Sequence, residues 1–173
     1  MKEFTISVFS ENKIGLLTRI VSVFTRRHIN VNSITASKSS IEGIHRYTIV
    51  VSLLEEEVRK VVAQIEKQVD VIKSFYYSND EIIHQEIALY KVPTKAFSDG
   101  NKVEQLIRLH NARILSIEPE YTVIEKTGHP KETELLLAEF QQFGILEFVR
   151  SGRVAIVKPM EQLNTYLKSL DNL

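Results

Sequence analysis

Strand and helix periodicities alternate along this chain in an order that occurs twice, and this repeated order restricts the folds open to it. Residues 4–8 alternate apolar and polar side chains, which is typical of a half-buried strand. Apolar residues then recur at helical spacing from Leu16 to Phe24. Two β-branched runs, 29–37 and 45–53, flank a polar loop that contains glycine, and they predict an antiparallel pair of strands.

A second helix and a fourth strand complete the first half of the chain. Glutamates occupy positions 55–57, where negative charge stabilises a helix N-terminus, and Val58, Val61 and Ile65 form an apolar stripe behind them. Residues 69–77 then predict a strand. The resulting βαββαβ order is that of the ferredoxin-like fold, in which two helices cover one face of a four-stranded antiparallel sheet.

The same order follows a polar stretch at residues 78–81. Its strands are predicted at 86–92, 113–117, 121–127 and 145–149, and its helices around residues 103–107 and 136–140. Two copies of one order in a chain of 173 residues favour two tandem ferredoxin-like domains of the α+β class over one larger domain. We expect a first domain at 1–78, a linker at 79–84 and a second domain at 85–173.

The last part of the chain extends this pattern. Residues 154–157 predict an added strand after a glycine-containing turn. Leu163, Leu167 and Leu170 follow Pro159 at helical spacing and predict a short closing helix. We expect both elements to decorate the second domain.

Composition and charge exclude several classes of function. The chain has no cysteine, so disulfides, thiolate metal sites and a cysteine nucleophile are ruled out. Basic and acidic residues both number 22, giving a formal net charge of zero, whereas nucleic-acid-binding domains usually have a basic excess. The five histidines are scattered without metal-site spacing, and the common glycine motifs of hydrolases and nucleotide-binding enzymes are absent. We therefore expect no nucleic acid and no metal.

Hydropathy also bears on the compartment. No apolar run is long enough to span a bilayer, and the N-terminal residues resemble a strand rather than a signal peptide. We therefore expect a cytoplasmic protein with no membrane partner.

The loop at residues 11–17 is the most informative stretch for function, because it joins the first strand to the first helix. Helix N-terminal N–H groups bind carboxylates, and Gly15 would let a ligand approach the backbone closely. The amide of Asn12 both donates and accepts hydrogen bonds, which an α-amino acid requires. The alternative is that Asn12 only caps the helix and Gly15 only eases a turn. Asn30 and Asn32 in the next strand fit equally well as outward-facing polar residues.

Several stretches resemble one known family. Residues 11–20 and 24–34 closely resemble the opening domain of acetohydroxyacid synthase (acetolactate synthase) small subunits. Residues 46–50 are similar to the next strand of that family, residues 85–92 to the start of its second domain, and residues 150–152 to the ending of that domain. By this resemblance the first domain is an ACT domain, which is a ligand-sensing module, and the second is ACT-like.

The resemblance implies a regulatory role without catalysis by this chain. Small subunits of this family raise the activity of a catalytic large subunit and convey feedback inhibition, usually by valine, in branched-chain amino acid biosynthesis. The catalytic partner depends on thiamine diphosphate, and we expect that cofactor, Mg and FAD on the partner and no cofactor on this chain. The effector site in this family lies between paired ACT domains, so we also expect a homodimer.

The resemblance assigns roles to individual residues of the effector site. Asn12 would bind the polar groups of the effector, and the backbone N–H groups of Gly15 and Leu16 would bind its carboxylate. Asn30 would reach the site across the dimer. Two further residues would line the apolar pocket, Ile14 and Val31.

The sequence also departs from the family pattern. Ser22 and His28 stand where the family commonly has glycine, and the loop at 37–44 lacks the usual proline. Two rival functions remain open. One is a free-standing amino-acid sensor that pairs only with itself, which would not co-purify with a catalytic subunit. The other is a small hydrolase, although no nucleophile or acid–base constellation is visible.

Overall fold

The computed structural model describes residues 1–98 and 101–158, and these residues form two compact units. The first unit comprises Met1–His84 together with the described residues that follow Gly152. The second unit is Gln85–Gly152.

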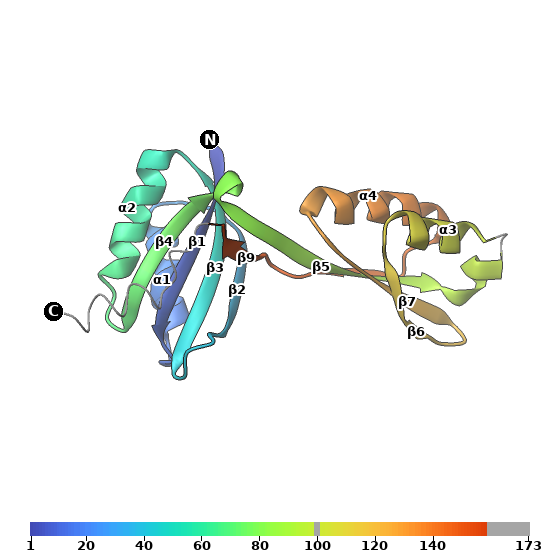
Figure 1. Ribbon diagram of the computed structural model, residues 1–173, viewed down its shortest axis with the longest axis horizontal. Helices are drawn as coiled ribbons and strands as arrows, with labels where there is room; N and C mark the ends of the chain where they lie inside the picture. Colours follow the sequence, from blue (N-terminus) through green and yellow to red (C-terminus); the bar gives the residue numbers. More distant parts are fainter. Residues whose placement is uncertain (99–100, 159–173) are drawn as a thin grey trace. The chain divides into compact units, whose positions relative to one another are not determined.

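The first unit has the predicted βαββαβ order. Its elements are β1 (Lys2–Glu11), α1 (Leu16–Arg26), β2 (Val31–Lys38), β3 (Ile44–Leu53), α2 (Glu55–Glu66) and β4 (Val71–Ser78). The strands form an antiparallel sheet in the order β2-β3-β1-β4. Within this unit, α1 and α2 lie along one face of the sheet (Figure 1). The ferredoxin-like fold predicted from periodicity is therefore confirmed.

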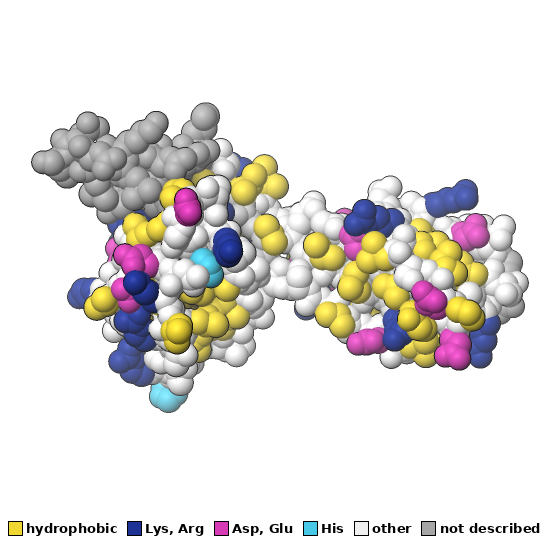
Figure 2. Space-filling model, turned by 90° about the horizontal axis from the view of Figure 1, so that it is seen from below, with side chains coloured by type: hydrophobic (Ala, Val, Ile, Leu, Met, Phe, Trp, Pro, Cys, Tyr) yellow, Lys and Arg dark blue, Asp and Glu magenta, His cyan; other side chains and the backbone are white. Residues whose placement is uncertain are grey.

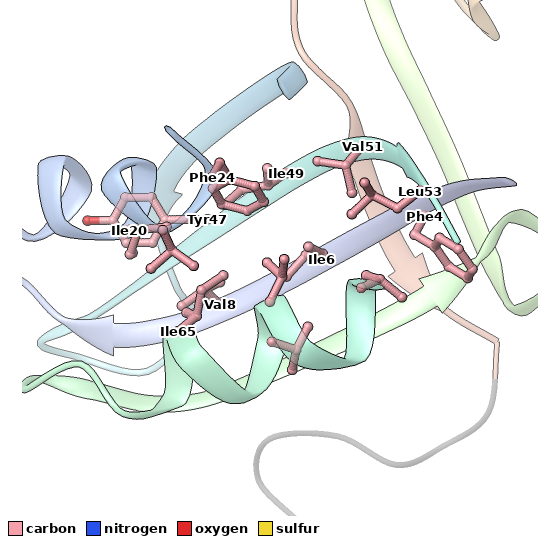
Figure 3. Packing of buried hydrophobic residues seen from close by; sticks show 14 of the residues in the cluster. Phe4, Ile6, Val8, Ile20, Phe24, Tyr47, Ile49, Val51, Leu53 and Ile65 are labelled. Carbon is pink, nitrogen blue, oxygen red and sulfur yellow. The ribbon is translucent and has the colours of Figure 1, made fainter. Parts of the chain in front are cut away.

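The core of the first unit lies between this sheet face and the two helices. Strand alternation places Ile6 and Val8 of β1 on the helix side, and Ile6 pairs directly with Ile49 of β3. Phe24 from α1 and Ile65 from α2 pack against them, and all of these side chains are buried (Figure 3). The apolar stripes predicted for both helices are thus the surfaces that meet the sheet.

The opposite face of the same sheet is polar and is covered by a distant part of the chain. Thr5 and Ser7 of β1 alternate with the core residues, so they point to this face, yet both are buried. The segment around strand β9 (Val154–Val157), which pairs with β5, is linked to this face by the side chains of Arg46 and Arg153. The guanidinium of Arg46 donates both to the Ser7 hydroxyl, at 3.1 Å, and to the carbonyl oxygen of Ala155, at 2.7 Å.

A buried arginine anchors this returning strand. Arg153 precedes β9 and is only 5% exposed. It donates to Thr5 Oγ1 at 2.8 Å, to Asn79 Oδ1 at 3.0 Å and to Glu3 Oε1 at 2.5 Å. Burial alone would raise the pKa of Glu3, but hydrogen bonds from Arg153 and Asn79 outweigh it and hold the pKa below its usual value.

The strand predicted at 154–157 is therefore present as β9. It pairs with β5, a strand of the second sheet, yet the described residues after Gly152 group with the first unit, so the boundary between the units falls after His84 and again after Gly152. The expected linker at 79–84 is also structured: a 3₁₀ helix, η1 (Asn79–Glu81), leads into β5. The predicted closing helix after Pro159 lies outside the described residues.

The second unit repeats the order of the first. Its elements are β5 (Ile82–Pro93), η2 (Thr94–Ser98), α3 (Lys102–Leu109), β6 (Arg113–Ile117), β7 (Tyr121–Gly128), α4 (Pro130–Phe140), η3 (Gln141–Phe143) and β8 (Glu147–Arg150). Its sheet has the order β6-β7-β5-β8, and α3 and α4 lie on one side of it (Figure 1).

The core of the second unit contains polar groups among its apolar side chains. Tyr90 packs against Phe140, with ring centroids 5.5 Å apart, and its hydroxyl donates to the carbonyl oxygen of Thr133 at 2.7 Å. The Thr133 hydroxyl in turn donates to Glu86 at 2.6 Å. This network satisfies groups that would otherwise be buried without partners.

The surface of the second unit carries exposed hydrophobic side chains, which Figure 2 shows in yellow among charged ones. Ile114, Leu115 and Ile117 on the edge strand β6 are all exposed. Across the described residues, no helix is long and apolar enough to cross a membrane.

Candidate functional site

The loop between β1 and α1 is fixed on two sides. The Asn12 N–H donates to the carbonyl oxygen of Gly43, at 3.2 Å, and the Glu11 N–H donates to that of Asp70, at 3.0 Å. Arg19, in the first turn of α1, forms an ion pair with the Asp70 carboxylate at 2.6 Å. The loop is therefore tied to the β2–β3 connection on one side and to the start of β4 on the other.

Gly15 has a conformation that few other residues adopt. Its φ is +81°, in the left-handed region, so the backbone itself favours glycine here. Apart from Gly15 itself and its two chain neighbours, no heavy atom lies within 4 Å of the position that a Cβ would occupy. The space above this backbone is therefore open to a ligand.

The N-terminus of α1 has no internal cap. Gly15 is the N-cap residue, no side chain bonds to the cap, and the first turn has no acidic residue. The alternative that Asn12 caps the helix is therefore wrong. Leu16 donates only a long hydrogen bond to Lys13, at 3.4 Å, and the Gly15 N–H has no backbone acceptor within the described residues. Free N–H groups and the helix dipole together favour a bound anion.

The side chains that the sequence assigned to this site differ in exposure. Asn12 and Ile14 are exposed, and Ile14 is completely so. Leu16 is fully buried in the core of the first unit, so only its backbone can meet a ligand. Asn30 is exposed just before β2, whereas Val31 is half-buried and packs against the core.

A metal centre has no support in the described part of the chain. Nowhere within residues 1–98 and 101–158 do three His, Asp or Glu side chains gather closely enough to hold an ion. The chemistry of the loop is instead that of an exposed amide, free backbone N–H groups and an apolar side chain. This set suits a small organic anion with an aliphatic part.

Comparison with known proteins gives two matches in the order of the two units. Residues 6–73 match the family described as AHAS small subunit-like ACT domain, and residues 85–159 match the small subunit of acetolactate synthase. The acetolactate synthase small subunit of Mycolicibacterium smegmatis is 34% identical over 152 residues, which cover 88% of this chain and 89% of that protein. The chain belongs to the acetolactate synthase small subunit family.

Two further relatives agree. The acetolactate synthase small subunit of Bacillus subtilis is 32% identical over 87% of this chain and 88% of its own length. The crystal structure of the Thermotoga maritima small subunit superposes with a TM-score of 0.84 at 26% identity, covering 93% of this chain and all of that one. The predicted family and its ACT domain are confirmed.

This small subunit does not bring all the predicted site residues together within one chain. Gly15 and Leu16 lie at the start of α1, whereas Asn30 and Val31 follow its end. An 11-residue helix is about 16 Å long at a rise of about 1.5 Å per residue. A single amino acid cannot bridge that distance, so a site built from both groups needs a second chain.

Sequence reasoning missed the residues that fix the loop of this small subunit. Arg19 reads as one more polar residue on an amphipathic helix, and its partner Asp70 is 51 residues away. For the connection between β2 and β3, the sequence likewise predicted only a polar loop. Gly43, with a φ of +77°, was the local signal of its tight conformation.

Proposed function

We propose that this small subunit binds valine between paired ACT units, activates the catalytic large subunit of acetolactate synthase and conveys feedback inhibition to it. The observation that carries the proposal is the open, uncapped N-terminus of α1, with Gly15 in the left-handed conformation. The chain itself would catalyse no step. Thiamine diphosphate, Mg and FAD would reside on the large subunit.

The chemistry of valine fits the loop in three parts. The free N–H of Gly15 and the N–H of Leu16, which has only a long hydrogen bond, would bind its carboxylate, and the exposed amide of Asn12 would bind its remaining polar group. Ile14 is completely exposed, and burying it against an aliphatic ligand would remove apolar surface from water. Each buried methylene-sized group contributes about 0.8 kcal/mol.

A second copy of the chain would complete the site. Asn30 and Val31 of the partner would supply the half that α1 holds away from Gly15 in a single chain, so the proposal includes a homodimer. Exposed hydrophobic side chains on β6 also support association with another protein surface. Valine would inhibit by favouring one arrangement of the chains, and such couplings are typically about 1–3 kcal/mol.

The test is the rate of acetolactate formation by the purified large subunit, titrated with this chain with and without valine. We expect saturable activation that valine reverses. Gly15→Asp should leave activation intact and abolish inhibition, because the new carboxylate repels that of valine. Gly144→Asp is the matched control, since Gly144 also has a positive φ, of +83°, but lies in the second unit.

Each outcome decides a separate part of the proposal. Unchanged valine sensitivity in the Gly15→Asp variant would refute the assigned site. Activation without any effect of valine would remove the effector claim and keep the partner. If the chain changes no rate, a free-standing amino-acid sensor becomes the better account.

A further inference from the structure

A pocket lies beside the loop between β1 and α1, which we call the α1 loop, and it is complete within one chain. It has a volume of about 270 Å³ and sits between Asn12 and the connection from β2 to β3. Pockets that enclose drug-sized ligands usually measure about 300–1,000 Å³, so this one suits a smaller molecule. Lys38, Glu42 and His45 supply its ionisable groups, and Ile41 and Ile44 supply its aliphatic lining.

Two basic side chains, Lys38 and His45, face each other in this pocket. Lys38 of β2 pairs directly with His45 of β3, so their side chains leave the sheet on the same face, with Cβ atoms about 5 Å apart. Within the described residues, neither side chain forms an ion pair. The Nε2 atom of His45 is buried and has no hydrogen-bond partner there. A buried polar atom without a partner is unfavourable, so a ligand that draws this ring toward the pocket would satisfy it.

A carboxylate also lines this pocket. Glu42 lines the same pocket and forms no ion pair with any described residue. We infer that this pocket, which we call the hairpin pocket, binds a short aliphatic α-amino acid. The carboxylate meets Lys38 and His45, the ammonium group meets Glu42, and the side chain packs on the two isoleucines. This site is additional to the proposed effector site between chains and does not depend on it.

The walls of the hairpin pocket are held by backbone hydrogen bonds. Ser39 donates to the carbonyl oxygen of Ile44 at 2.8 Å, and Ile44 donates to that of Ile41 at 3.2 Å. Gly43 accepts from Asn12, which joins the pocket to the α1 loop. A pocket ordered in advance loses less conformational freedom on binding. Occupancy of the hairpin pocket would also contact Asn12, a residue of the proposed effector site.

The experiment is calorimetric titration of the full chain carrying Gly15→Asp with valine, because this background removes the proposed site at α1. We expect one valine per chain to remain. Adding Lys38→Met or His45→Leu should weaken this binding at least about tenfold. Lys95→Met, which removes an exposed positive charge in the second unit, is the matched control and should leave it unchanged.

Two analogues of valine test the paired charges directly. 3-Methylbutanoate lacks the ammonium group and isobutylamine lacks the carboxylate, so both should bind the Gly15→Asp chain more weakly than valine. On the wild-type chain, valine should also shift the imidazole proton resonances of His45. The Lys38→Met chain should show a smaller shift at the same valine concentration.

Absence of valine binding to the Gly15→Asp chain would overturn the inference, provided that the His45 resonances of the wild-type chain also fail to move. Binding that is indifferent to Lys38→Met and His45→Leu would overturn it as well. Failure of the proposed function has a different signature, which is acetolactate formation that neither this chain nor valine alters. The two outcomes are therefore distinguishable.

Discussion

The two units share one order of strands and helices, yet a network of buried polar groups lies on the helix side of the sheet in one unit and on the other side in the other. In the first unit the helix side is mostly apolar, and the buried Thr5 and Ser7 lie on the other face, which Arg46 and Arg153 link to the segment around β9. In the second unit the polar network of Tyr90, Thr133 and Glu86 lies between the sheet and α4. The same fold can therefore bury a polar network on either side of its sheet.

The two units also differ at the N-termini of their helices α1 and α4. The N-terminus of α4 is occupied by its own chain, because the Glu132 carboxylate accepts a hydrogen bond from the His129 N–H at 2.7 Å. The N-terminus of α1 has neither an acidic residue in its first turn nor a side-chain cap. An external carboxylate can therefore compete for α1 but not for α4, which explains why the proposed effector site lies in the first unit.

The largest expected effect comes from the polar face of the first unit. Arg153→Ala should lower the free energy of unfolding by about 3 kcal/mol, because it leaves Glu3 and Thr5 without their buried partner. Urea denaturation measures this loss. Lys60→Ala is the control, since Lys60 only pairs with Glu56 on the exposed side of α2 and should cost less than about 0.5 kcal/mol. Equal losses in the two variants would show that β9 is not anchored by Arg153.

That anchor marks the limit of what the sequence predicted about the fold. Residues 154–157 were recognisable as a strand because local β-propensity is a property of neighbouring residues. The sheet face that the strand covers depends on Arg153 and Arg46 reaching groups more than 100 residues away in the chain, and no local pattern records such contacts. The elements were therefore predictable, whereas the assignment of β9 to a unit was not.

A smaller effect is expected from the polar core of the second unit. Tyr90→Phe removes the hydroxyl that donates to Thr133 while keeping the ring against Phe140. We expect a loss of about 1 kcal/mol, because one buried hydrogen bond disappears without a large cavity. Tyr121→Phe, at a half-buried position, is the control for removal of a tyrosine hydroxyl. A change near zero for Tyr90→Phe would mean that the network is not needed in this core.

Substitution of Gly15 in the α1 loop should change stability by a similar amount. Gly15→Ala should cost about 1 kcal/mol of stability, because alanine disfavours a φ of +81° although the space for its methyl group is open. Gly15→Asn should cost less, since asparagine adopts the left-handed region more readily. Thermal unfolding of the two variants would show the order. An alanine variant as stable as the wild type would contradict the loop conformation.

Part of the candidate site could be located from local features of the sequence. Gly15 was identified because a glycine between a strand and a helix usually allows either a tight turn or the close approach of a ligand to the backbone. The position of Asn12 beside the hairpin pocket was not, because it depends on a backbone hydrogen bond to Gly43 in another connection.

The smallest effect concerns the cap of α4. The His129 N–H lowers the pKa of Glu132 below its usual 4.5, so the folded protein binds this proton less tightly than the unfolded chain does. The stability from this group is therefore present above about pH 4.5 and is lost as the pH falls through the folded pKa. Glu132→Gln should cost about 0.5 kcal/mol at neutral pH and almost nothing at strongly acidic pH. A difference that persists in acid would exclude charge as its cause.

The return of the chain to its first sheet also affects how the protein is synthesised. A ribosome makes β1 to β4 before any residue of the second unit, but the covering strand β9 comes only after that unit is finished. Until then Thr5, Ser7 and Arg46 face the cellular milieu or other proteins. A nascent chain that stops anywhere within the second unit therefore leaves the first one unfinished as well.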